Sequence, residues 1–434
     1  MKSFFLLDEQ SSILNNRERI LYFILVIFFF TLYMPAVTWL YNVLMYVIFV
    51  YSFFFNCLAE KWTILKSRKG ILIVIIFFLL NCLSALISTD KRVGISFVGL
   101  RISLFVLPVA LGSLYIKNYL KERLILGFAI ATFFAALGCV AWAIFKAAEH
   151  HDLSLLYNDN LSAIINLQSI YFAMFVNLAI FSFIFLLISK SKLVNSKVII
   201  SLVLFLFVVQ FLLASRIAIF TLYATMVCVA LYYIIQKKMI IRGIGFIISL
   251  AVLSVLLVKV FPDTVNRFNE LGYTKFDYKS TAKESHFTRP LTADQWNGAN
   301  TRLAVWNCAW EIIKDQPIFG TRLGDKKEAL RKEYVLKDFK EGFNKNTHNN
   351  YLDVWMSLGL VGLVLFLTGF FILPLYDTFK YQDWYGSIII ISFMISLFTE
   401  TYMDRTMGNT ALAFFLSFIA SYKKPEIDGT DLKK

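Results

Sequence analysis

Long apolar runs, separated by shorter polar segments, recur along almost the whole 434-residue chain. Their lengths suit helices that cross the hydrocarbon core of a bilayer, which need about 17–25 mostly apolar residues. Charges and turn residues divide the runs into twelve predicted spans, at 20–36, 38–58, 71–88, 95–115, 124–146, 167–188, 197–214, 217–235, 241–261, 352–375, 386–402 and 408–422. Only Ala214, Ser215 and Arg216 divide 197–235, so one re-entrant or broken segment is the alternative there. The pattern predicts an all-α polytopic membrane protein.

The charge of the connecting segments alternates from one loop to the next. With the N-terminus in the cytoplasm, the cytoplasmic side receives segments with at least three basic residues each, at 59–70, 116–123, 189–197, 236–243 and the C-terminus. The 376–386 loop is the exception, and the opposite short loops carry far fewer basic residues. Because cytoplasmic loops are enriched in Lys and Arg, both termini are predicted to be cytoplasmic. The first span is then interpreted as a retained signal anchor.

One polar segment, 262–351, is far longer than the other loops, and this topology places it in the periplasm. Long loops in compact proteins are usually functional. The predicted organisation is therefore as follows: 1–261, transmembrane helices one to nine; 262–351, a periplasmic loop with amphipathic helices; 352–422, transmembrane helices ten to twelve; 423–434, a cytoplasmic tail.

Helical spacing returns in the second half of this loop. The first predicted helix is capped by Asn300 or Thr301 and ends at Pro317, and its apolar stripe is Leu303, Trp306, Trp310 and Ile313. A second amphipathic helix is predicted at 326–342, with Leu330, Tyr334 and Leu336 facing inward.

Composition narrows the functional class. Hydrophobic residues make up 58% of the chain and charged residues 17%, so the bilayer, with its membrane lipid, is the solvent. The net charge of +14 is explained first by the cytoplasmic loops, and we expect no nucleic-acid partner. The sequence has neither a metal-binding Cys/His spacing nor a glycine-rich phosphate loop, so we expect no metal and no cofactor.

His348 is the first candidate for chemistry. It precedes the tenth predicted span, at the outer boundary of the membrane, and Asn349 follows it. A histidine in this position is suited to general-base catalysis, because its charge changes near neutral pH. The alternative is a helix-capping polar cluster, in which Gly359 and Gly362 permit close helix packing.

Two arginines are candidates for binding an anion. Arg216 stands alone between two apolar runs, where a charge usually marks a substrate path, although it could also extend to the interface. Arg302 lies at the start of the first loop helix, and its guanidinium fork and the helix N-terminus both suit phosphate. For Arg302 the alternative is a solvated loop charge.

Further basic candidates lie near the fourth span: Lys91, Arg92 and Arg101. Arg101 is about two turns into an apolar run, so it is expected to face the bundle interior. Asp404 and Arg405, in the last outer loop, are candidate mutual partners. His150, His151 and His286 are interpreted as exposed loop histidines.

The spacing of several of these residues resembles a known family. His348-Asn349, nine residues, Gly359, two residues and Gly362 resemble the H-[NSQ]-x9-G-x2-[GTY] signature of bacterial O-antigen ligases. Residues 300–325 resemble the Arg-Trp and Pro-x-x-Gly stretch that precedes this signature in the O-antigen ligase/polymerase superfamily. The motifs cover about the last third of the chain. Arg322 stands where the family usually has a second glycine. This departure either adds a phosphate contact or is only a variant turn.

The resemblance implies a metal-independent enzyme of GT-C type. Such a ligase transfers O-antigen from undecaprenyl diphosphate to the lipid A-core, on the periplasmic face and with inversion at the anomeric carbon. The essential histidine corresponds to His348, and the two essential arginines correspond to Arg216 and Arg302. Arg101, Arg92, Lys91, Arg322 and Asn349 are then expected to bind substrate.

Three alternatives stay open at this point. An O-antigen polymerase would carry R-x10-G patterns, a spacing that Arg331 and Gly342 satisfy, as do Arg101 and Gly112 within a span. A protein O-oligosaccharyltransferase would use a hydroxyl on a protein. A flippase or transporter would show helix-breaking residues within paired spans and an internal repeat, and the sequence has neither.

Overall fold

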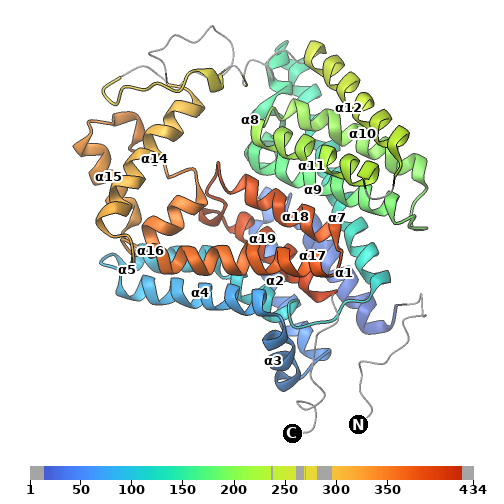
Figure 1. Ribbon diagram of the computed structural model, residues 1–434, viewed down its shortest axis with the longest axis horizontal. Helices are drawn as coiled ribbons and strands as arrows, with labels where there is room; N and C mark the ends of the chain where they lie inside the picture. Colours follow the sequence, from blue (N-terminus) through green and yellow to red (C-terminus); the bar gives the residue numbers. More distant parts are fainter. Residues whose placement is uncertain (1–13, 236–237, 261–267, 269, 281–295, 423–434) are drawn as a thin grey trace.

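The computed structural model describes residues 14–235, 238–260, 268, 270–280 and 296–422, and within them every regular element is helical. The helices are α1 (Asn16–Thr31), α2 (Thr38–Tyr51), α3 (Leu58–Ser67), α4 (Lys69–Ile87), α5 (Lys91–Arg101), α6 (Ser103–Ala110), α7 (Asn118–His150), α8 (Asn158–Leu161), α9 (Ser169–Ile188), α10 (Ser196–Leu212), α11 (Arg216–Ile235), α12 (Ile240–Val260), α14 (Gly298–Asp315), α15 (Lys326–Leu336), α16 (Asn350–Leu367), α17 (Leu373–Lys380), α18 (Trp384–Ser396) and α19 (Thr406–Ser421). In Figure 1, α14 and α15 lie on the opposite side of the molecule from α10, α11 and α12.

The helices confirm a membrane protein but not the predicted number of spans. Among the described residues, five segments are long and apolar enough to cross a bilayer: Lys69–Ile87, Lys91–Ala110, Asn118–His150, Ser169–Ile188 and Asn350–Lys380. A sixth is counted if Trp39–Phe54 and Leu58–Ser67, bent by 104°, form one span. The remaining apolar helices are shorter. The fold is therefore that of a polytopic helical membrane protein, and twelve spans remain a prediction.

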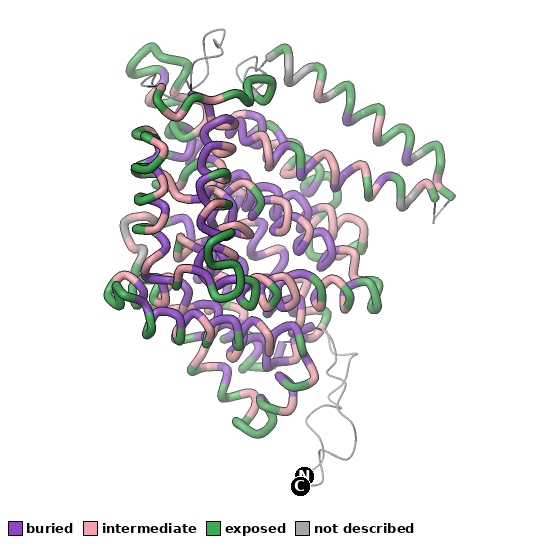
Figure 2. Tube along the Cα trace, turned by 60° about the vertical axis from the view of Figure 1, so that its left-hand side comes forward, coloured by how far each residue is buried: buried purple, intermediate pink, exposed green. Residues whose placement is uncertain are grey.

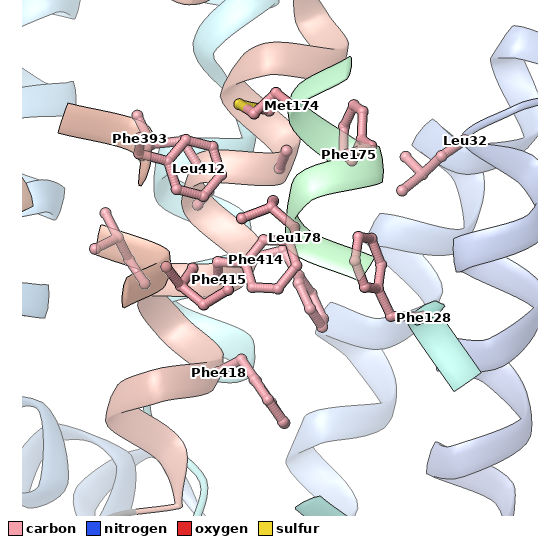
Figure 3. Packing of buried hydrophobic residues seen from close by; sticks show 14 of the residues in the cluster. Leu32, Phe128, Met174, Phe175, Leu178, Phe393, Leu412, Phe414, Phe415 and Phe418 are labelled. Atoms are coloured by element: carbon pink, nitrogen blue, oxygen red, sulfur yellow. The ribbon is translucent and has the colours of Figure 1, made fainter. Parts of the chain in front are cut away.

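Aromatic packing joins the central helices. Figure 3 shows Phe128 of α7 and Phe175 of α9 close to Phe414 and Phe415 of α19. The rings of Phe128 and Phe415 meet edge to face, with centroids 5.0 Å apart. Since lipid tails are as apolar as these side chains, helix association in a membrane depends on such close packing rather than on escape from water.

The surface of the bundle is also apolar. Figure 2 shows buried residues through the centre of the molecule and exposed residues along its periphery, including one side of the outlying helices. Many of the exposed residues are large hydrophobic side chains, among them Phe134, Ile144, Phe220, Ile248 and Val252. An apolar surface of this extent is expected where lipid covers it.

Polar contacts join the loops at each of the two ends of the helical bundle. At one end the Arg68 guanidinium donates to the carbonyls of Gly112 and Leu114, at 2.7 and 2.6 Å, and reaches Ser421. At the other end the backbone N–H groups of Thr89 and Asp90 donate to the Asp325 carboxylate, both at 2.9 Å. The first group joins a loop predicted to be cytoplasmic to the predicted cytoplasmic ends of two spans, and the second joins segments predicted to be periplasmic.

A turn from the long loop inserts into a break in α16. Gly359 has φ +68° and ψ −170°, which interrupts the helix. The segment 317–322 hydrogen-bonds to the backbone groups on both sides of the break: Thr321 and Arg322 donate to Met356 and Ser357, at 2.8 and 2.9 Å, and Leu360 and Val361 donate to Pro317 and Ile318, at 2.9 and 3.4 Å. Irregular backbone at membrane depth requires such partners within the protein.

The role of the motif glycine is therefore different from the predicted one. A Cβ on Gly359 would lie 2.0 Å from the carbonyl oxygen of Ile318. The glycine therefore allows a loop, rather than a neighbouring helix, to approach the backbone of α16 closely. Gly320 of the Pro-x-x-Gly stretch also has a positive φ of 65° and contacts the same break. The two family motifs thus form one structural unit.

The two loop helices form, with different boundaries and faces. Asn297, not Asn300 or Thr301, caps α14, and Asn300 returns the hydrogen bond. The buried face of α14 is made of smaller residues such as Ala304 and Cys308, whereas Trp310 is exposed. Of the predicted stripe, Ile313 is buried, but Leu303 and Trp306 are only half-buried, because small side chains occupy the face that α15 and α16 approach. In α15, Leu330 and Tyr334 are buried as predicted, but Leu336 is exposed.

Candidate active site

The candidate site forms where the start of α14 meets two loops, the one before α16 and the one after α18. His348 lies in the first loop with φ +43°, and its backbone N–H donates to Asn346 Oδ1 at 3.1 Å. Asn349 then caps α16, because its side-chain oxygen accepts from the N–H groups of Tyr351 and Leu352. Asn349, rather than His348, is thus the helix-capping residue. The imidazole of His348 takes no part in the cap and can make other contacts.

A single carboxylate connects the histidine to an arginine. Nδ1 of His348 lies 3.1 Å from Oε2 of Glu400, and Nη2 of Arg302 lies 2.6 Å from Oε1 of the same side chain. Two carbonyls fix the rest of the guanidinium: Thr399 accepts from Nε at 3.1 Å and Gly298 from Nη1 at 2.7 Å. Arg302 is therefore a held side chain, not a solvated loop charge.

Glu400 is buried, with 7% of its side chain exposed. Burial disfavours its charged form, but the hydrogen bond from His348 and the charge of Arg302 outweigh burial and hold the pKa of Glu400 below its ordinary value. Glu400 is thus a carboxylate at neutral pH. Because a carboxylate can only accept, Nδ1 of His348 donates in this contact, and in the neutral imidazole Nε2 is then the nitrogen with the lone pair.

Arg216 reaches the same place from the other side of the molecule. It is the first residue of α11, after a helix break in which Ala214 has φ +50°. The helix thus breaks where the sequence analysis divided the run 197–235, and two spans or one broken segment both fit this break. A Cβ built on Gly298 would lie 3.0 Å from Nη2 of Arg216 and 3.2 Å from Nη1 of Arg302. The two guanidinium groups therefore flank one glycine, and a side chain there would meet both.

Arg101 belongs to a different cluster. Its fully buried guanidinium contacts Asn81, Asp353 and Asp404, at 2.5, 3.5 and 3.4 Å. Nζ of Lys326 lies 2.7 Å from both of these aspartates. Arg101 faces the bundle interior as predicted, but this geometry favours a structural role over the predicted substrate contact.

The predicted pairing of Asp404 with Arg405 is wrong. Asp404 pairs with Lys326 and Arg101, and these cations hold its pKa below the ordinary value although burial opposes ionisation. The Arg405 guanidinium lies over the ring of Tyr171, 5.7 Å from its centroid. Asp404 and Arg405 are adjacent in the sequence, but the cations that pair with Asp404 are Lys326 of α15 and Arg101 of α5.

The other predicted substrate-binding residues lie apart from His348. Lys91 and Arg92 are exposed in the first turn of α5. Arg322 has φ +79°, the backbone region that favours glycine, and its guanidinium donates to the carbonyl of Ile87 at 2.9 Å. Of the two interpretations of Arg322, the variant turn therefore agrees with its backbone conformation. His150 and His151 are exposed as predicted, and His286 lies outside the described residues.

Glu400 is the site residue that the sequence analysis missed. It fell inside the predicted span 386–402, in a segment without a motif. Its presence in an apolar run was itself a signal, because ionisable groups in such runs usually have a function. Elsewhere in the described part of the chain, no group of three His, Cys, Asp or Glu side chains is placed to hold a metal ion.

The fold and this site define a polytopic helical membrane protein with a histidine, a carboxylate and two arginines at one end. A family model described as O-antigen ligase matches residues 200–367, a range that contains Arg216, Arg302 and His348. This match supports membership of the O-antigen ligase superfamily, which the motifs also predict. Members of this superfamily are glycosyltransferase-like ligases and polymerases. No curated protein matches the chain in a sequence comparison.

Proposed function

We propose that the protein is an O-antigen ligase, which transfers a glycan from undecaprenyl diphosphate to the lipid A-core on the periplasmic face of the inner membrane. The transfer is independent of metal and inverts the anomeric carbon. The observation that carries this proposal is the Glu400 carboxylate, which contacts His348 at 3.1 Å and Arg302 at 2.6 Å. It connects a candidate base to a candidate diphosphate ligand.

His348 acts as the general base. Its Nδ1–H donates to Glu400, so Nε2 is left to accept the proton of an acceptor hydroxyl. The hydroxyl oxygen attacks the anomeric carbon of the donor sugar, and the bond from this carbon to the diphosphate oxygen breaks with its electron pair. The ionised Glu400 stabilises the imidazolium that forms.

Arg302 and Arg216 stabilise the leaving diphosphate. Both guanidinium groups lie around Gly298, where the absence of a side chain leaves room for close approach. The planar fork of arginine suits phosphate oxygens, and a positive charge close to the leaving oxygen lowers the barrier as negative charge develops there. Arg302 is fixed by two carbonyls and a carboxylate, so little reorganisation is needed during transfer.

The test is reconstitution with purified protein in detergent, a lipid-diphosphate-linked glycan and lipid A-core, without metal or nucleotide. We expect glycan transfer, and a large loss of it in Arg302→Lys, which keeps the charge but not the fork. Arg19→Ala is the control, because Arg19 is exposed on α1. Wild-type transfer by Arg302→Lys would contradict the role of the fork.

Deletion of the gene distinguishes the ligase from its relatives. A ligase deletion leaves lipid A-core without O-antigen while long lipid-linked polymer accumulates. A core that carries a single repeat unit would instead indicate a polymerase. Loss of protein glycosylation would indicate an oligosaccharyltransferase.

A further inference from the structure

A large cavity lies beside the loop that carries His348, and residues 343–346 of this loop line it. Its volume is about 1800 Å³, and its walls are the ends of α4 and α5, the turn at 317–324, α15 and residues 343–346. Pockets for small molecules usually measure about 300–1,000 Å³, so this cavity suits a larger ligand. His348, Arg216 and Arg302 are not among its lining residues.

One side of the cavity is apolar and open. Leu83 of α4 is 56% exposed, Phe319 of the inserted turn 78%, and Val361 of α16 42%. The helices α4 and α16 belong to segments that are long and apolar enough to cross a bilayer. They pack directly near Phe77 and Phe366, whose rings are 5.7 Å apart. The exposed apolar side chains of α4, the inserted turn and α16 therefore give the cavity a wall that lipid can reach.

Another part of the cavity lining is basic. Its lining cations are Arg322, Lys326, Lys327, Arg331, Lys332, Lys345 and Arg405. The carboxylates in the lining already have partners: Asp353 and Asp404 pair with Lys326, Glu328 pairs with Arg331, and Asp325 and Asp90 accept from backbone N–H groups. Among the described residues, no carboxylate forms an ion pair with Lys327 or Lys332. The local field therefore favours an anion.

We propose that this cavity binds the phosphate-bearing head group of a multi-acyl lipid, with the phosphates near Lys327 and Lys332 and the acyl chains leaving between α4 and α16. The proposal rests on the proposed function, in which this lipid is the acceptor. The donor diphosphate is assigned to Arg216 and Arg302, outside the cavity. Asn346 links the cavity to the candidate active site, because it lines the cavity and its side-chain oxygen accepts a hydrogen bond from the backbone N–H of His348.

The test is binding of lipid A, with its two phosphates, to purified protein in detergent, without donor. The variant Lys327→Glu/Lys332→Glu should bind at least about tenfold more weakly than wild type, because each basic residue near a lipid surface contributes several-fold to anionic-lipid binding. Lys340→Glu is the matched control, since it is exposed in the same loop but does not line the cavity. Lipid A without phosphates should bind weakly to all forms.

Three outcomes would overturn the proposal: equal binding by the double variant and wild type, equal binding of phosphate-free lipid A, or displacement of lipid A by inorganic phosphate at equal concentration. Thermal unfolding in detergent shows whether the double variant is folded. His348→Ala should bind lipid A as wild type does. If binding follows these expectations but transfer fails, the proposed function alone is wrong; if wild type transfers and the double variant binds normally, only the cavity assignment is wrong.

Discussion

Nδ1 of His348 lies 3.1 Å from Oε2 of Glu400, although 52 residues separate them in the chain. The carboxylate approaches the imidazole from the loop between α18 and α19, and the imidazole precedes α16. This contact fixes both the orientation of the ring and the nitrogen that carries the proton. The chemistry of the proposed base therefore depends on a residue outside the recognised motif.

Glu400→Gln should slow glycan transfer by at least about tenfold, because an amide does not stabilise the developing imidazolium. The acid limb of the pH–rate profile should also move to lower pH, since the imidazolium loses a neighbouring negative charge. The measurement is the initial rate of transfer as a function of pH. The control is Glu311→Gln, which removes an exposed carboxylate that pairs with Lys314 on α14. An unchanged profile in Glu400→Gln would exclude the positioning role.

The ionised Glu400 should also stabilise the fold, with a definite pH dependence. A carboxyl group whose pKa is depressed in the folded protein stabilises it above the ordinary value of 4.5, and this contribution is lost as the pH falls through the folded value. Wild type should therefore exceed Glu400→Gln in thermal stability at pH 7, and the difference should shrink below pH 4.5. Thermal unfolding in detergent at a series of pH values measures this. A difference that grows on acidification would have the wrong sign.

Gly359→Ala should destabilise the protein by about 2–5 kcal/mol, because alanine is strained at φ +68° and its Cβ would overlap the carbonyl of Ile318. Unfolding in mixed micelles measures the loss. The matched control is Gly138→Ala in α7, where a Cβ meets nothing within 4 Å. We expect the control to be neutral or slightly stabilising, since alanine favours helix. Equal stability of the two variants would mean that the break in α16 does not need glycine.

The buried charges around Lys326 should behave as one unit. Lys326→Met leaves Asp353 and Asp404 with one fewer cation in a buried site, and should cost about 3–5 kcal/mol of unfolding free energy. Lys326→Met/Asp404→Asn removes one charge of each sign and leaves the Arg101–Asp353 pair. Its destabilisation should be smaller than the sum of the two single changes. Additive losses in unfolding experiments would show that the pairs are independent.

The sequence predicted three of the four residues at the candidate site for local reasons. His348 and Arg302 lie in recognisable motifs, and Arg216 is a lone charge between apolar runs. Glu400 has no fixed spacing to either motif, so its contact with His348 depends on how α16 and α18 pack. Arg101 was correctly predicted to face inward, but its partners come from distant elements, α16 and the last outer loop.

Helix positions were predictable where apolar runs are bounded by polar residues. The break in α16 was not, because residues 352–375 are continuously apolar and only the turn at 317–322 shows why the helix opens there. The face of α14 was misjudged for a related reason. Large tryptophans fit the helical period, but the smaller side chains such as Ala304 pack where other helices come close.

The central claim is that His348 takes the proton of the acceptor, and the rate of transfer by His348→Ala tests it most directly. Loss of a general base should lower this rate about 10²–10⁴-fold. Binding of the lipid-diphosphate donor should persist, because Arg216 and Arg302 are unchanged, and the exposed His150→Ala variant should transfer normally. Wild-type transfer by His348→Ala would contradict the mechanism.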